Sequence, residues 1–184
     1  MLKSHSHFKA GLVAIAALAV LALLPAGANA SCDGGGLTPA EVGICTPTPK
    51  ARLLKNGMLI PPKSAPAKVR RVIAFANRIR TKPYVWGGGH GHWWDRGYDC
   101  SGSVSYALHG GNFLTSPLPS GPMERWGLPG EGRWITVYAN PGHAYAVIAG
   151  YRWDTAGDSR GTGPRWHEEM LSNAGFVARH PAGF

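Results

Sequence analysis

Three strand-like segments follow one another between residues 134 and 155, and they limit the possible folds more than any other feature of the sequence. The segments 134–139, 143–149 and 151–155 are rich in β-branched and aromatic residues, and only short turns containing Gly or Pro separate them. Parallel neighbours need a crossover connection of a dozen or more residues, so strands joined this closely can pair only in antiparallel fashion. We therefore expect an antiparallel meander in this region.

Two helices are expected before these strands. Apolar residues recur at helical spacing over residues 67–80, and this helix should end before Pro83. A second, shorter helix is expected from Cys100 to the Gly110-Gly111 pair. Helices followed by an antiparallel meander indicate an α+β domain in which the helices pack on an antiparallel sheet.

The N-terminus has the three-part pattern of an export signal. Residues 1–30 combine a basic start, an apolar run over Ala10–Leu24 and small residues at 28–30 before a cleavage point. The apolar run is short for a membrane-spanning helix, which needs about 20 residues, so a retained anchor is the weaker alternative and no stable membrane insertion is expected. Residues 31–65, rich in Pro and Gly, are expected to form an arm or linker, and 66–184 the domain.

Composition narrows the possible partners. The chain has 184 residues and a formal net charge of +9, which suits a single exported domain, predicted to be a monomer, that is attracted to anionic surfaces such as wall polymers. Basic charge alone fits solubility equally well. No run of Lys and Arg with interleaved aromatic residues is present, so nucleic acid is not an expected partner.

Three cysteines in an exported chain leave one thiol over. Cys32 and Cys45 can pair near the mature N-terminus, which leaves Cys100 alone. Cys100 stands where a loop becomes a helix, and the unsatisfied N–H groups at a helix N-terminus favour the nucleophilic thiolate. A buried structural cysteine is an equally ordinary explanation of this residue alone.

His143 and Asp154 are candidate partners for this thiol. His143 opens the second strand, where it can act as a general base, although a strand-end His that bonds to a backbone carbonyl is a common alternative. If Ala149 and Gly150 form a two-residue turn, Asp154 lies opposite Tyr145 and diagonally beside His143 on the same face. Asp154 can then orient the imidazole; a shift of one residue would instead leave it solvated on the other face.

The sequence around these residues resembles a known family. Pro83-Tyr84-Val85-Trp86-Gly87-Gly88, then Asp99-Cys100-Ser101-Gly102, then Gly142-His143 before an apolar strand, are similar in order and spacing to the NlpC family of papain-like cysteine peptidases. The resemblance covers roughly residues 66–156. It implies a papain-like α+β fold with the nucleophile at a helix N-terminus.

The resemblance also implies roles for individual residues. Cys100 would be the nucleophile and His143 the base. The family's third polar residue is most often His; here the sequence departs from that pattern, and the third catalytic role is assigned to Asp154 from the hairpin geometry, since carboxylates orient His in other hydrolases. Four further motif residues are expected to line the substrate site: Tyr84, Trp86, Asp99 and Ser101.

The resulting prediction is a thiol hydrolase secreted to the periplasm or cell wall. It would cut amide bonds in peptidoglycan stem peptides, between D-glutamate and a diamino acid, without a cofactor. The alternatives are an amidase of the same fold, a catalytically silent peptidoglycan-binding or regulatory domain, and a structural protein with a buried Cys100. His90, His92 and Asp95 offer metal-ligand chemistry, but two His in a Gly-rich loop are more often simply exposed, so no metal is expected.

Overall fold

A computed structural model describes residues 48–157 and 162–184, which belong to one compact unit, Thr46–Phe184. The expected export signal at 1–30, and the expected pairing of Cys32 with Cys45, lie outside the described residues. Within the described ranges, no helix combines the length and the apolar character needed to cross a membrane.

Both expected helices are present. Helix α1 (Ala67–Ile79) buries one face in the core, and helix α2 (Cys100–Gly110) begins at the cysteine and ends at the expected glycines. A third helix, α3 (Ser120–Met123), is a single turn. The buried face of α1 consists of apolar side chains at helical spacing together with one amide: Val69, Val72, Ile73, Ala76, Asn77 and Ile79.

The expected meander forms the centre of the sheet. Strands β4 (Ile135–Asn140), β5 (His143–Ile148) and β6 (Tyr151–Asp154) pair in antiparallel order. Ala149 and Gly150 both have positive φ angles, 48° and 81°, as a two-residue turn between twisted strands requires. This confirms the expected α+β fold, with Cys100 as the first residue of a helix.

The C-terminal tail completes the sheet, which sequence patterns did not indicate. Strands β7 (Arg165–His167) and β8 (Val177–His180), with the short β3 (Leu128–Pro129), extend the meander to six strands in the order β3-β8-β4-β5-β6-β7. Each of these pairings is antiparallel. The tail therefore adds a strand to each side of the predicted meander.

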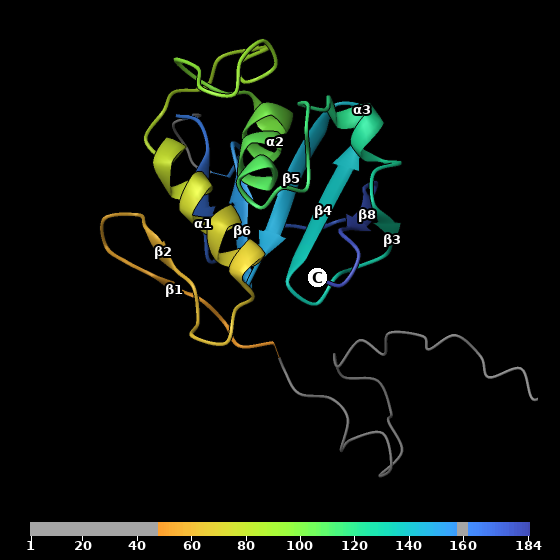
Figure 1. Ribbon diagram of the computed structural model, residues 1–184. Coiled ribbons are helices and arrows are strands. Elements are labelled where there is room, and N and C mark those ends of the chain that lie inside the picture. Colours follow the sequence, from red (N-terminus) through yellow and green to blue (C-terminus); the bar gives the residue numbers. More distant parts are fainter. Residues whose placement is uncertain (1–47, 158–161) are drawn as a thin grey trace, which may run out of the picture. The chain divides into compact units, whose positions relative to one another are not determined.

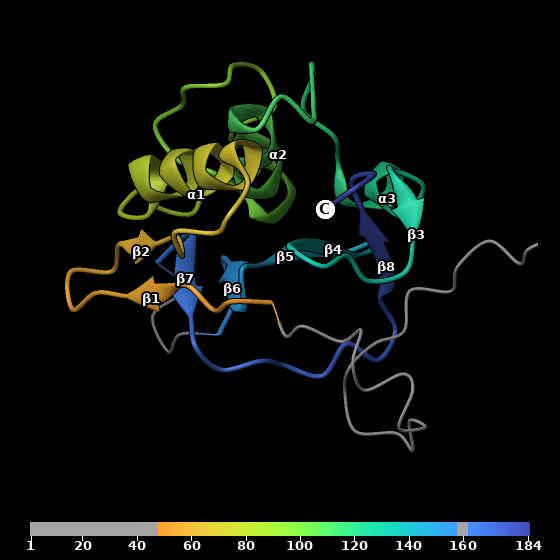
Figure 2. The same ribbon diagram turned by 60° about the horizontal axis from the view of Figure 1, so that its bottom comes forward.

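The two faces of the sheet are covered differently (Figures 1 and 2). Helices α1 and α2 lie on one face, where the indole Nε1 of Trp153 donates to the carbonyl oxygen of Ser103 at 3.2 Å. The connection between β7 and β8, residues 168–176, crosses the opposite face (Figure 2). We call residues 168–176 the strap. Because side chains alternate along a strand, His143, Arg152 and Asp154 point to the strap side.

Part of the expected N-terminal arm packs on the domain. Strands β1 (Arg52–Leu53) and β2 (Leu59–Ile60) form a small hairpin, and Leu59 is fully buried. The Asn77 side chain accepts from the N–H of Leu59 and donates to its carbonyl oxygen, at 3.0 and 2.9 Å. The same amide oxygen accepts from the indole of Trp166 at 2.9 Å. Asn77 of α1 thus bonds both to the β1–β2 hairpin and to β7.

Candidate active site

Cys100 lies at the N-terminus of α2 and is a free, half-buried thiol. The carboxylate of Asp99 caps the helix by accepting from the N–H of Gly102 at 2.7 Å. The first N–H groups of a helix have no partners within it, so they stabilise negative charge at this position. The local sequence Asp-Cys-Ser-Gly therefore builds a setting that favours a thiolate.

His143 is placed by the turn between β4 and β5. The side chain oxygen of Asn140 accepts from the N–H groups of Gly142 and His143, at 3.0 and 2.8 Å. The hydroxyl of Ser120, at the start of α3, donates to the carbonyl oxygen of Pro141 at 3.1 Å. The turn that presents the imidazole is therefore held both internally and from a neighbouring helix.

The structure brings His143 and Asp154 together. Strand β6 pairs with β5 in the register expected from the turn, with Ile148 opposite Tyr151. His143 Nε2 and Asp154 Oδ1 lie 2.9 Å apart, and the carboxylate side chain is only 1% exposed. Because Nε2 faces Asp154, the ring nitrogen left to face the Cys100 thiol is Nδ1.

The electrostatics favour an ion pair between Cys100 and His143. Burial alone would raise the pKa of the Cys100 thiol, but hydrogen bonds from His143 and the N–H of Ala144 outweigh it, so the pKa falls below its ordinary value. Burial would likewise lower the pKa of His143, whereas hydrogen bonds to Asp154 and Cys100 raise it to about 9. The two shifts have the directions that stabilise a thiolate beside an imidazolium.

Tyr84 lies near the nucleophile and is partly exposed, with 39% of its surface accessible. The pKa of its phenol is raised, mainly because the group is partly buried and also because Cys100 and Asp99 carry negative charge nearby. Tyr84 is therefore a neutral hydrogen-bond donor at the edge of the site. Trp86, by contrast, is 86% exposed.

Asp99 is the N-cap of α2 and Ser101 is its second residue, and both are buried. His90 Nε2 lies 3.0 Å from Asp99 Oδ1 and 3.2 Å from the Ser101 hydroxyl, which itself donates to that carboxylate. The other carboxylate oxygen accepts from the N–H of Gly87 at 3.2 Å. The polar atoms of Asp99 and Ser101 are thus used to attach the loop 87–98 to α2.

Three residues around His143 were not singled out from the sequence. Asn140 precedes a Pro-Gly pair, which is a recognisable turn signal. Arg152 donates to Asp154 Oδ2 at 2.9 Å, and its place two residues before Asp154 on one strand puts both side chains on the same face. Phe176 packs edge-on against the His143 ring, with centroids 6.2 Å apart, and comes from the tail, for which no local pattern gave a position.

No group of three or more metal-binding side chains converges within residues 48–157 and 162–184. His90 bonds to Asp99, and Asp95 accepts from the N–H groups of Gly89 and Arg96.

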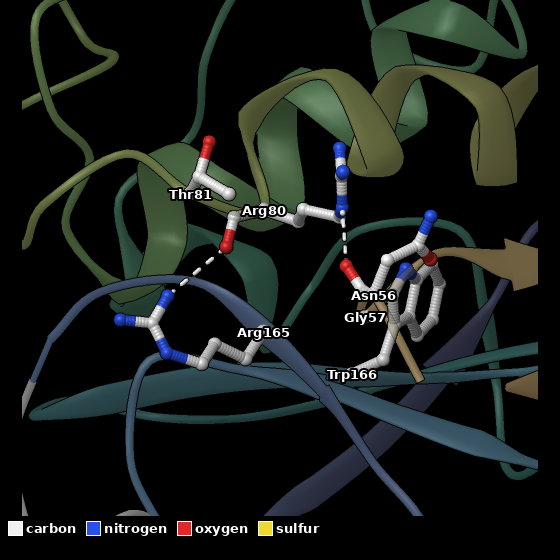
Figure 3. A pocket seen from close by; sticks show the side chains of 6 residues that line it. All are labelled: Asn56, Gly57, Arg80, Thr81, Arg165 and Trp166. Carbon is white, nitrogen blue, oxygen red and sulfur yellow. Dashed lines mark hydrogen bonds between the residues drawn. The ribbon is translucent and has the colours of Figure 1, made fainter. Parts of the chain in front are cut away.

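A cavity of about 360 Å³ lies elsewhere, between the β1–β2 turn, the end of α1 and β7 (Figure 3). The guanidinium of Arg165 donates to the carbonyl oxygen of Arg80, whereas that of Arg80 extends toward Asn56 (Figure 3). The two cations therefore do not converge on a common ligand.

The fold and the site together define a class: an α+β domain of papain-like arrangement, in which a cysteine at a helix N-terminus meets a histidine on an antiparallel sheet. No protein-family model and no curated protein sequence matches the chain. The solved structures that it resembles are those of NlpC/p60 domain proteins and peptidoglycan hydrolases.

Three of these structures give the extent of the similarity. The peptidoglycan hydrolase RipB from Mycobacterium tuberculosis is 26% identical, with a TM-score of 0.48 over 61% of this chain; the chain spans 64% of the RipB chain. RipD from the same organism, a non-catalytic NlpC/p60 domain protein, is 20% identical, with a TM-score of 0.46. The match covers 63% of this chain and 98% of the RipD chain. The P60 domain of a Mycobacterium avium paratuberculosis antigen is 21% identical, with a TM-score of 0.47. The match covers 61% of this chain and 93% of the P60 chain.

Proposed function

We propose that this protein is an exported cysteine hydrolase that cleaves amide bonds in the stem peptides of peptidoglycan. The observation that carries the proposal is the continuous arrangement of a free thiol at a helix N-terminus, an imidazole hydrogen-bonded to it, and a buried carboxylate 2.9 Å from the far side of that imidazole. Nucleophile, base and orienting group in this order are the parts that thiol-dependent acyl transfer needs.

Cys100 and His143 each have a defined role in the proposed reaction. The Cys100 thiolate attacks the amide carbonyl carbon, and the tetrahedral oxyanion accepts a hydrogen bond from the Cys100 N–H at the start of α2. The intermediate collapses to a thioester as the His143 imidazolium gives its proton to the departing amine. A water then attacks the thioester, transferring a proton to the now neutral His143. The acid is released, and the thiolate–imidazolium pair is restored.

Asp154 orients the imidazole during this cycle. Its carboxylate fixes Nε2 as the protonated nitrogen, which keeps Nδ1 aimed at the thiol and at the leaving amine. At its position the NlpC family more often has a histidine. A carboxylate does the same work and adds a negative charge that stabilises the imidazolium.

For the substrate we propose the bond between D-glutamate and the diamino acid of the stem peptide. The proposal follows from the motifs around Tyr84, Cys100 and His143, which resemble those of the NlpC family. The formal net charge, +9 for the whole chain and +7 without Lys3 and Lys9 of the signal-like residues 1–30, suits a protein that works on an anionic wall outside the cell membrane, and residues 1–30 supply the route of export. The phenol of Tyr84, kept neutral, can donate to a substrate carbonyl beside the thiol.

Mass spectrometry of purified peptidoglycan tests the proposal. The wall material is incubated with the protein and, in parallel, with the Cys100→Ala variant. New fragments that depend on Cys100, with masses that place the cut after D-glutamate, are the expected result. Fragments cut between the sugar-linked lactyl group and the first alanine would instead identify an amidase. No cleavage, with both proteins retained on the wall material, would replace the hydrolase with a binding module.

A further inference from the structure

We propose that Arg152 is a positioning residue of this site: its buried guanidinium holds Asp154 in the orientation that receives the His143 ring, and the strap in turn holds Arg152. The inference rests on the proposed function, because Arg152 acts through Asp154 on the thiol chemistry. It adds a residue to the site that neither the sequence motifs nor the catalytic steps above contain.

The two oxygens of Asp154 have separate partners. Oδ1 lies 2.9 Å from His143 Nε2 and accepts from the N–H of Ala156 at 3.0 Å. Oδ2 accepts from Arg152 Nη1 at 2.9 Å, and both side chains of this ion pair are only 1% exposed. Without the guanidinium, Oδ2 would lose this bond, and only the bonds to Oδ1 would resist rotation of the carboxylate about its terminal torsion, which is otherwise broad. Arg152 at Oδ2 and the N–H of Ala156 at Oδ1 thus together keep Oδ1 facing the imidazole.

The charge of Arg152 has a second consequence. A buried carboxylate is strongly destabilised unless a cation compensates it. His143 compensates Asp154 only while it is an imidazolium, and it loses that proton to the leaving amine at each acylation. Arginine stays charged throughout, so Asp154 keeps one permanent counter-ion when the imidazole is neutral.

The strap holds the guanidinium of Arg152 through a hydrogen bond. Arg152 Nε donates to the carbonyl oxygen of Glu169 at 3.0 Å, so one planar fork joins the strap to the carboxylate. Gly157 lies against the same guanidinium, and a Cβ at this position would collide with it. Its φ of 103° is also one that favours glycine. Phe176, at the far end of the strap, contacts the rings of His143 and Tyr145 at centroid distances of 6.2 and 5.2 Å.

The test compares Arg152→Met and Arg152→Lys with the unmodified protein, using native alkylation of Cys100 by iodoacetamide as a function of pH. This rate follows the thiolate fraction and therefore the thiolate–imidazolium pair. The titratable and charged groups facing that pair are Asp99 and Tyr84 beside the thiol and Asp154, Arg152 and Tyr145 beside the imidazole. None of these except Arg152 changes in the two variants.

We expect Arg152→Met to lower the alkylation rate at pH 7 by about tenfold and Arg152→Lys to restore part of it, since lysine keeps the charge but not the fork. In an Asp154→Asn background, Arg152→Met should have little further effect, because both changes remove the same orienting bond. Arg179→Met is the matched control. Arg179 donates to the carbonyl oxygens of Trp126 and Gly127, and its loss should leave the alkylation profile unchanged.

A structural role alone would give a different pattern. If Arg152→Met and Arg152→Lys lowered only the midpoint of urea unfolding and left the alkylation profile of the folded protein unchanged, the proposal would be overturned. Equal effects of Arg152→Met with and without Asp154 would also overturn it. Where Arg152→Met does not fold, the lysine variant supplies both comparisons. Peptidoglycan cleavage is measured separately, so a protein that cuts no peptidoglycan but shows the Arg152-dependent alkylation profile would contradict the proposed function and leave this inference standing.

Discussion

Gly102, in the first turn of α2, lies directly against the backbone carbonyl oxygen of Gly88, so closely that a Cβ on Gly102 would collide with it. The contact joins the helix that carries Cys100 to the Gly-rich loop before it. The N–H of Asp99 also donates to that carbonyl oxygen, at 3.2 Å. The glycine of the Asp-Cys-Ser-Gly motif is therefore required by the space beside the nucleophile.

Gly102→Ala should consequently displace the N-terminus of α2. We expect a loss of about 1–3 kcal/mol in the free energy of unfolding, typical of an overpacked site, together with slower alkylation of Cys100. Gly121→Ala in α3 is the control, because the nearest atom to its Cβ position is 4.0 Å away. Urea unfolding and iodoacetamide rates check both variants. A Gly102→Ala protein as stable and as reactive as the control would contradict this close contact.

Asp154→Asn should weaken the site by changing charge rather than shape. Burial lowers the pKa of His143 and the bond to Asp154 raises it, so loss of the carboxylate charge should bring that pKa down from about 9. The imidazolium is then depleted at neutral pH and the ring loses its fixed tautomer. We expect peptidoglycan cleavage to fall by roughly 100-fold or more.

The pKa of His143 can be followed by NMR titration of the ring protons in both proteins. A variant whose His143 titrates as in the parent protein would show that Asp154 does not control the imidazole.

The local parts of the fold were predictable from the sequence. Helix α2 begins at Cys100 because an N-cap aspartate precedes it, and it ends at glycines. The two-residue turn at Ala149-Gly150 set the register that placed Asp154 beside His143. These features depend on neighbours a few residues away, and propensity and alternation describe such neighbours well.

The long-range parts were not predictable. Phe176 reaches His143 only because β8 pairs with β4, across a connection that passes under the sheet. The tail strands β7 and β8 have only three and four residues, too few to show a clear alternation. The sequence puts Arg152 on the same strand face as Asp154. Its bond to the strap, however, depends on where the C-terminal tail lies, which no local pattern predicts, so its role could not be inferred from the sequence.

Asn77 offers a test of stability away from the site. Its buried amide bonds to both backbone groups of Leu59 and to the indole of Trp166, so Asn77→Ala leaves three polar groups without these partners. We expect the free energy of unfolding to fall by about 2–4 kcal/mol, with unchanged alkylation of the folded protein. Asn56→Ala is the control, since Asn56 is exposed, its side chain accepts from the N–H of Met58 in the same turn, and the substitution keeps the backbone carbonyl that accepts from Arg80. Equal unfolding midpoints for the two variants would contradict the role of Asn77.

The bond between His143 and Asp154 also predicts how stability changes with pH. Cys100→Ala is used as the parent, so that titration of the thiol does not contribute. That variant also lacks the contribution of Cys100 to the pKa of His143, and we expect the bond to Asp154, which raises this pKa, to keep it above the unfolded value of about 6.5. A pKa raised by folding means that the folded state binds the proton more tightly. The stability that this adds is complete below about pH 6.5 and is lost as pH rises through the folded-state pKa.

The measurement is the difference in unfolding free energy between Cys100→Ala and Cys100→Ala/His143→Gln, determined by urea at pH 5.5 to 9.5. We expect the difference to be largest at the acidic end and to shrink steadily above neutral pH, because only the parent loses a stabilising proton. Glutamine keeps much of the volume and a hydrogen-bond donor toward Asp154 without titrating. A difference that stayed constant over the range, or grew with pH, would mean that Asp154 does not hold His143 as an imidazolium.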